Sequence, residues 1–336
     1  MKLCEVVIEP VSAFGTPLKG DTLFGHFCWQ AEMNSNLLNG GLKTWLKVYD
    51  SKPFIVFSSA FPVLRENKRT VKYFFPTPAC PLHFYNISNS EKDKNCFDMV
   101  SSLKELKKKK WIAVSSERLV LEVDLNRRLS DRDVVRELGL GDGLWKRISQ
   151  PHNSINRLSF TTSGRNFAPY TQENTWFAPG LELVIFVLYM EDALDVEKIS
   201  KAMKNIGRLG FGRDASTGLG RFRVKDYREI PLPNIQGYKF LYTLSPFVPL
   251  PGRNEQIWFQ PFIRFGRHGN YLAVSDHPFK NPVIMADEGA VIECSDGWTK
   301  PYVGRALRGL SKIQPEAVGQ GYTMVIPCEL KGRTER

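Results

Sequence analysis

The segment at residues 207–221, GRLGFGRDASTGLGR, constrains the fold most, because it places five glycines within fifteen residues. Glycine loses more backbone freedom on folding than any other residue, so glycines gather where a chain needs positive φ or a close approach. A helical pattern precedes this segment and an alternating pattern follows it. The sequence therefore predicts a helix, a glycine loop and a strand, although a mobile hairpin between helix and strand would have the same composition.

Two strand-and-helix units surround the loop in the sequence. Residues 183–190 form an apolar run typical of a buried strand, and Asp195 then caps a helix whose apolar positions are Val196, Ile199, Met203 and Ile206. Near the N-terminus, residues 3–8 predict a strand and residues 10–20 a turn-rich connection. Asp21 is the expected N-cap of the next helix. Its apolar face consists of Leu23, Phe24, Phe27, Cys28 and Ala31.

These patterns predict an α+β protein with two ferredoxin-like (RRM-like, split βαβ) domains. The first spans residues 1–230 and carries the glycine loop and a large insertion at about 65–180, with a short helix near 132–138. The second spans residues 231–336, where prolines separate short strand-like runs. We expect strands at 53–61, 238–244, 258–265, 283–286, 290–294 and 322–330.

The chain is basic, with 46 Lys and Arg against 35 Asp and Glu, a net charge of +11. Such a balance attracts polyanions and makes nucleic acid the favoured partner. The run of lysines at 107–110, with Lys104 before it, is interpreted as a solvated segment rather than a binding patch.

The glycine loop has the chemistry of a phosphate site. Arg208, Arg213 and Arg221 can donate paired hydrogen bonds to phosphate, while Ser216 and Thr217 add hydroxyl donors. A nucleotide triphosphate loop would end in Gly-Lys-Ser/Thr, and a dinucleotide fingerprint would follow a strand rather than a helix. Both of those enzyme classes are excluded.

A second polar segment, residues 153–165, is rich in hydrogen-bond donors and has few strong apolar anchors. Phe167 and Tyr170 follow it and can stack on unpaired bases. We expect a hairpin that projects from the insertion, although an ordinary polar loop would have a similar composition.

The pattern G-x-G-x5-G-x-G from Gly210 to Gly220 resembles the signature of the RAMP superfamily of CRISPR proteins. The segments SAFGTPLKGDTLFG at 12–25 and HNSINR at 152–157 are similar to the Csm subunit-four family of type III-A effector complexes. The three segments span the N-terminal two thirds of the chain, and most of the insertion and of the C-terminal part shows no such likeness.

The resemblance implies a subunit that binds the 5′ handle of the CRISPR RNA (crRNA) and contacts the large polymerase-like subunit and a backbone RAMP subunit. It implies RNA contacts in three segments: Gly15, Thr16 and Lys19; Asn153, Asn156, Arg157 and Arg165; and Arg208, Gly210, Gly212, Arg213, Ser216, Thr217, Gly218, Gly220 and Arg221. A related subunit of another type III complex stays open, as does a protein scaffold that only tolerates neighbouring RNA.

A metal-independent RAMP endoribonuclease that processes CRISPR RNA is the alternative enzyme, with His26 as its general base. No positioned partner for His26 is apparent, and Asp214 is expected only to turn the chain or orient Arg213. We therefore expect no catalytic residue, no metal and no cofactor. The spacing of the cysteines and the absence of a long apolar run or a leader-like N-terminus predict a cytoplasmic protein without membrane contact.

Overall fold

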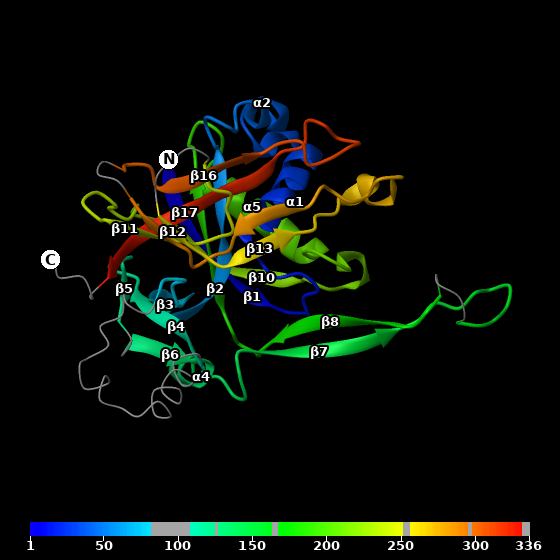
Figure 1. The fold of residues 1–336 in the computed structure, drawn as a ribbon, viewed down its shortest axis with the longest axis horizontal. Helices are drawn as coiled ribbons and strands as arrows, with labels where there is room; N and C mark the ends of the chain where they lie inside the picture. The colour runs from blue at the N-terminus through cyan, green and yellow to red at the C-terminus, as the bar shows by residue number, and fades with distance from the viewer. Residues whose placement is uncertain (82–107, 125–126, 163–166, 251–255, 295–297, 331–336) are drawn as a thin grey trace.

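A computed structural model describes residues 1–81, 108–124, 127–162, 167–250, 256–294 and 298–330. It has the α+β architecture that the sequence predicts, with two large and mostly antiparallel sheets and a hairpin that projects from one side (Figure 1).

The first sheet has seven strands in the order β10-β1-β9-β2-β3-β4-β6, and every neighbouring pair is antiparallel. Every residue of β9 is buried, because this strand lies between two others and carries an unbroken apolar run. The strands are β1 (Lys2–Pro10), β2 (Ile55–Glu66), β3 (Arg69–Pro76), β4 (Lys109–Ser115), β6 (Arg128–Ser130), β9 (Leu183–Tyr189) and β10 (Phe222–Ile230).

Two helices make the crossovers of this sheet. Helix α1 (Gly20–Met33) connects β1 to β2, and α5 (Val196–Leu209) connects β9 to β10. Asp195 caps α5 as predicted, since its carboxylate accepts the Lys198 N–H at 2.8 Å. The predicted cap of α1 is wrong. That helix begins at Gly20, and Asp21 lies in its first turn, where it binds the Arg264 guanidinium at 2.5 and 2.7 Å.

The second sheet has the order β12-β15-β11-β17-β16, and β5 from the insertion pairs with β17 in parallel. A separate ribbon joins two further strands, and the 3-10 helix η6 (Asn270–Val274) lies between them in sequence. No α-helix occurs in the part of residues 231–330 that the structure describes. The strands are β5 (Leu121–Val123), β11 (Phe240–Thr243), β12 (Ile257–Trp258), β13 (Pro261–Arg264), β14 (Val283–Ala286), β15 (Val291–Glu293), β16 (Tyr302–Leu307) and β17 (Gly319–Leu330).

One hydrophobic core extends from the first sheet into the second. Buried Gln320 of β17 accepts the Phe57 N–H at 2.9 Å and donates to the Phe57 carbonyl at 2.7 Å, where β2 has a bulge. Gly20 packs against the same bulge, because a Cβ there would lie 2.1 Å from the Phe57 carbonyl oxygen. The start of α1 is thereby fixed against both sheets.

The insertion extends the first sheet and then leaves the body. Ser130 and Asp133 form a reciprocal cap at the start of α4 (Asp131–Glu137), which confirms the predicted short helix. The following strands β7 (Trp145–His152) and β8 (Tyr170–Phe177) form a two-stranded sheet of their own, the projecting hairpin, which an isolated bridge between Thr175 and Phe14 joins to the body (Figure 1). The remaining described helices are η1 (Ser35–Leu37), α2 (Leu42–Lys47) and η5 (Ala215–Thr217).

Candidate nucleic-acid interface

The glycine loop between α5 and β10 is tightly folded on itself. Gly210, Gly212, Gly218 and Gly220 all have positive φ, as the glycine content predicts. A Cβ at Gly220 would lie 2.0 Å from the Phe211 carbonyl oxygen, and one at Gly210 would lie 2.5 Å from that of Leu219. The glycines therefore permit, first of all, close packing of the loop against its own backbone.

Most of the loop's inward-facing amides have protein acceptors. The Phe211 N–H donates to the Gly220 carbonyl at 2.9 Å, and the Gly220 N–H donates to the Ala13 carbonyl at 2.7 Å. The Gly212 N–H donates to His26 Nε2 and the Arg213 N–H to Thr16 Oγ1, both at 2.9 Å. These amides are not free to ring an anion, so contacts to phosphate fall to the side chains of the loop.

His26 supports this loop from α1. Its ring stacks on Phe211 with the centroids 4.8 Å apart, and burial lowers the pKa of the imidazole to about 4. The ring is therefore neutral at physiological pH, and its Nε2 accepts a backbone proton from the loop. This position gives His26 a structural role.

Arg213 joins the glycine loop to the hairpin. Its guanidinium donates to the Glu173 carbonyl and to Asn174 Oδ1 of β8, both at 2.8 Å, and lies 3.3 Å from the Asp214 carboxylate. Gly15 leaves room for this side chain, because a Cβ there would lie 2.8 Å from Arg213 Nε. Arg213 thus holds the base of the hairpin, and its side chain stays 37% exposed beside the loop.

Arg208 and Arg221 present outward cations at the two ends of the loop. Both residues are exposed. Gly207 brings the two chain ends together, since a Cβ there would lie 2.3 Å from the Phe222 carbonyl oxygen. Ser216 and Thr217 are also exposed, at the turn η5. This set, Arg208, Arg221, Ser216 and Thr217, is the part of the loop that is open to phosphate.

Lys19 is not part of that exposed surface. Its ammonium is buried, lies 2.5 Å from Asp287 and 2.7 Å from Glu288, and sits over the Phe262 ring at 4.6 Å. Lys19, which the family resemblance assigned to RNA, instead connects the loop before α1 to the second sheet.

The hairpin tip carries the second predicted segment. The Asn156 side chain accepts the Leu158 N–H at 2.9 Å and its carbonyl accepts the Phe160 N–H at 2.7 Å, which shapes a tight turn. Asn153 and Arg157 are exposed there, while Arg165 lies outside the described residues. From Asn174 to Tyr170 the strand alone measures about 13 Å, so one phosphate cannot contact both the loop and the tip.

The sequence interpretation missed two apolar side chains at this tip. Leu158 is 95% exposed and Phe160 is 83% exposed, the latter with φ of 54°. A single apolar residue within a polar turn is a sequence signal for an exposed apolar side chain, because its polar neighbours in the turn cannot bury it. Nearer the body, His152 stacks on Tyr170 with the ring centroids 5.5 Å apart, and Phe167 is half-buried.

Comparison with known proteins gives a fold but no sequence relative. No family model and no curated protein matches the sequence. A chain in the crystal structure of the Csm3-Csm4 subcomplex of a type III-A CRISPR-Cas interference complex superposes with a TM-score of 0.55 at 13% identity, covering 97% of this chain and 99% of that one. A chain in the Csm1-Csm4 cassette in complex with cA4 gives a TM-score of 0.56 at 15% identity, with 97% and 98% covered.

Csm4 is the component that these two complexes share. The chain has a Csm4-like fold. Arg213 joins two of the predicted segments, since its N–H donates to Thr16, and its guanidinium binds Asn174 at the base of the hairpin whose tip carries the third segment.

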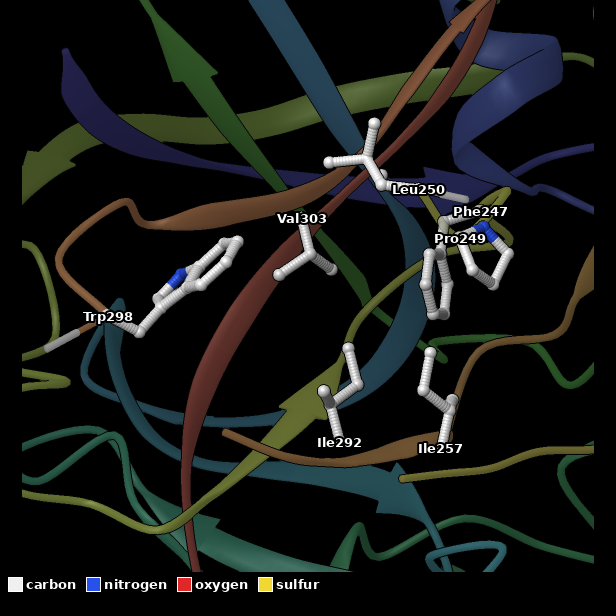
Figure 2. A pocket seen from close by; sticks show the side chains of 8 residues that line it. Phe247, Pro249, Leu250, Ile257, Ile292, Trp298 and Val303 are labelled. Carbon is white, nitrogen blue, oxygen red and sulfur yellow. The ribbon is translucent and has the colours of Figure 1, made fainter. Parts of the chain in front are cut away.

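A small pocket elsewhere in the Csm4-like fold does not compete with this interface. It lies in the smaller apolar core of the second sheet, and its volume of about 20 Å³ suits one water molecule (Figure 2). Its lining includes Phe247, Pro249, Leu250, Ile257, Ile292, Trp298 and Val303.

The described residues contain no group of three or more His, Cys, Asp or Glu side chains placed to hold a metal ion. They also contain no helix that is long and apolar enough to cross a membrane.

Of the lysine run, Lys109 and Lys110 begin β4, whereas Lys104 and Lys107 lie outside the described residues.

Proposed function

We propose that this chain is a non-catalytic RNA-binding subunit of a type III-A CRISPR effector complex, and that it binds the 5′ handle of the crRNA. Its protein partners in this proposal are the large polymerase-like subunit and a backbone RAMP subunit. The observation that carries the proposal is the likeness over 97% of the chain to proteins solved in Csm1-Csm4 and Csm3-Csm4 complexes.

The RNA-binding part of the proposal rests on the outward side chains. Arg208, Arg221, Ser216 and Thr217 surround the glycine loop, and Arg157 extends the cationic surface to the hairpin tip. Guanidinium groups and hydroxyls at exposed loops are the usual donors to a nucleic-acid backbone. A single-stranded handle that passes from the loop to the hairpin would meet both sets.

The proposal includes a finer description of the fold. We infer that β10-β1-β9-β2 with α1 and α5 is a ferredoxin-like unit, because it combines two β-α-β crossovers in one antiparallel sheet. Residues 231–336 are then a second, strand-rich half that packs against α1. A cytoplasmic location belongs to the same proposal.

The absence of catalysis is also a proposal, and His26 is the residue that tests it. In the structure its Nε2 accepts the Gly212 N–H, so a role as general base would require the loop to release it. We expect the purified chain to leave single-stranded crRNA intact with and without divalent metal. Cleavage by wild type that disappears in His26→Ala would promote the endoribonuclease alternative.

The main experiment measures affinity and assembly together. The chain is titrated with guides that carry a native or a scrambled 5′ handle, and it is co-expressed with the large and the backbone subunits of a type III-A complex. We expect tighter binding of the native handle and co-purification with both subunits. Equal affinity for unrelated RNA and no co-purification would refute the proposal.

A further inference from the structure

Helix α1 contains a glycine that the fold does not require. Gly25 lies in the interior of α1, and a Cβ added there would meet nothing within 4 Å. Glycine in a helix interior costs about 0.5–1 kcal/mol relative to alanine. The described protein offers no packing reason for this cost, so the helix surface over Gly25 is shaped for something that approaches it from outside.

The glycine loop borders this surface on one side. His26, the next residue along α1, accepts the Gly212 N–H and stacks on Phe211. The exposed Arg208 stands where α5 enters the loop. A ligand over Gly25 would therefore lie beside the loop and its cations.

An aromatic pair borders the other side. Trp29 lies one helical turn after Gly25, and residues four apart on a helix are neighbours on its surface. Its indole packs edge-to-face with Tyr271 of η6, with the centroids 5.6 Å apart. Tyr271 is 65% exposed, so much of its phenol ring has no protein neighbour. Gly269 admits the indole, because a Cβ there would lie 3.0 Å from Trp29 Nε1.

The charges near the surface favour an anionic ligand. Arg267 is exposed and is held against η6 by a 2.9 Å hydrogen bond to the Ala273 carbonyl. The nearby carboxylate of Asp21 is neutralised by Arg264. Glu32, exposed one turn beyond Trp29, would repel a phosphate and marks the far end of the surface. Cations interleaved with an exposed aromatic ring are the pattern of single-stranded nucleic-acid binding.

We propose that the surface of α1 over Gly25 binds one unpaired nucleobase of the RNA, with Tyr271 and Trp29 as its stacking wall. The base lies flat against the bare helix backbone at Gly25, and its phosphates lie toward the glycine loop and Arg267. This site rests on the proposed function, since it takes a base of the same RNA strand that the loop holds.

Gly25 supplies a test in which stability and binding move in opposite directions. Because a Cβ at this position would meet nothing within 4 Å and leucine favours a helix more than glycine does, we expect Gly25→Leu to keep or raise the melting temperature while it covers the surface. We expect its affinity for handle RNA to fall about tenfold, within the range measured for loss of one stacked base. Gly141→Leu is the matched control, because Gly141 also faces open space and has ordinary φ.

The aromatic wall has its own pair of variants. Tyr271→Ala should lose about tenfold in affinity, whereas Tyr271→Phe keeps the ring and should bind like wild type. Phe259→Ala is the control, since Phe259 is an exposed aromatic residue of the same C-terminal part and lies outside the proposed site. Photo-crosslinking with 5-bromouridine at each handle position should join one position to Trp29 or Tyr271.

The outcomes separate this site from the proposed function. If wild type binds no handle RNA, both fail. If Arg157→Ala and Arg208→Ala weaken binding but Gly25→Leu and Tyr271→Ala do not, the base site is refuted and the function stands. Loss of a protein subunit from the complex in Tyr271→Ala, with RNA affinity unchanged, would assign the surface to a protein and overturn the inference.

Discussion

Lys19, Asp287 and Glu288 form a nearly buried ionic group where the loop before α1 meets the second sheet. Burial raises the pKa of the Glu288 carboxyl to about 7, although Lys19 opposes this shift. Breaking such a group by removing one partner is costly, because the remaining charge stays buried without compensation. Lys19 therefore bears on the proposed RNA surface only indirectly, by fixing the loop that carries Thr16.

The raised pKa of Glu288 predicts a pH dependence of stability. Between the ordinary pKa of a glutamate and about 7, the folded protein holds a proton that the unfolded chain has released. The free energy of unfolding therefore falls as pH rises through this window. We expect Glu288→Gln to flatten that decline in urea unfolding at pH values from about 5 to about 8. The exposed Glu316→Gln is the control, and an equal decline in all three proteins would contradict the assignment.

The orientation of the β7-β8 hairpin depends on the contacts at its base. An isolated two-stranded ribbon is only marginally stable, so its base must hold it. That base consists of the paired backbones of Phe14 and Thr175 at 2.8 and 2.9 Å, the Phe14 and Phe177 rings with centroids 5.4 Å apart, and the Arg213 contacts to Asn174. Arg157 at the tip depends on this base for its position.

A double-mutant cycle tests that dependence. If Arg213 and Asn174 act as one clasp, Arg213→Ala and Asn174→Ala should each weaken handle binding, and the double variant should lose little more than either. The coupling should amount to about 0.5–3 kcal/mol, as for residues in direct contact. Arg208→Ala combined with Asn174→Ala should instead be additive. Additive losses in both cycles, with circular dichroism showing folded variants, would rule out the clasp.

The elements that the sequence predicted are those with local signals. The periodic helices, the buried strand β9, the positive φ of the loop glycines and the projecting hairpin all follow from residues close in sequence. The pairing of β5 with β17 and the Lys19 contact, whose partners are 268 residues apart, have no local signal. The sequence of β16, with Gly304 and Arg305 in its middle, alternates too little between apolar and polar residues to predict a strand.

On the scale of the whole molecule, the shared core makes the two sheets one packed body. The hairpin leaves this body and carries exposed cations away from it (Figure 1). Net charge of +11 acts at long range on any polyanion, whereas in the proposed function the loop and the hairpin tip decide where contacts form. The salt dependence of binding separates these two contributions.

For single-stranded RNA, the logarithm of the binding constant should fall by about 0.7 per phosphate contacted for each unit of the logarithm of salt concentration. If Arg157 and Arg208 each contact a phosphate, Arg157→Ala and Arg208→Ala should each reduce this slope by about 0.7 and cost roughly 1.5–3 kcal/mol of affinity. Lys43→Ala, at an exposed position on α2, removes the same unit of charge and should leave the slope unchanged. Affinity measured over a series of salt concentrations gives all four slopes. An equal reduction in Lys43→Ala would mean that net charge alone attracts the RNA, because Lys43 belongs to none of the segments proposed to contact it.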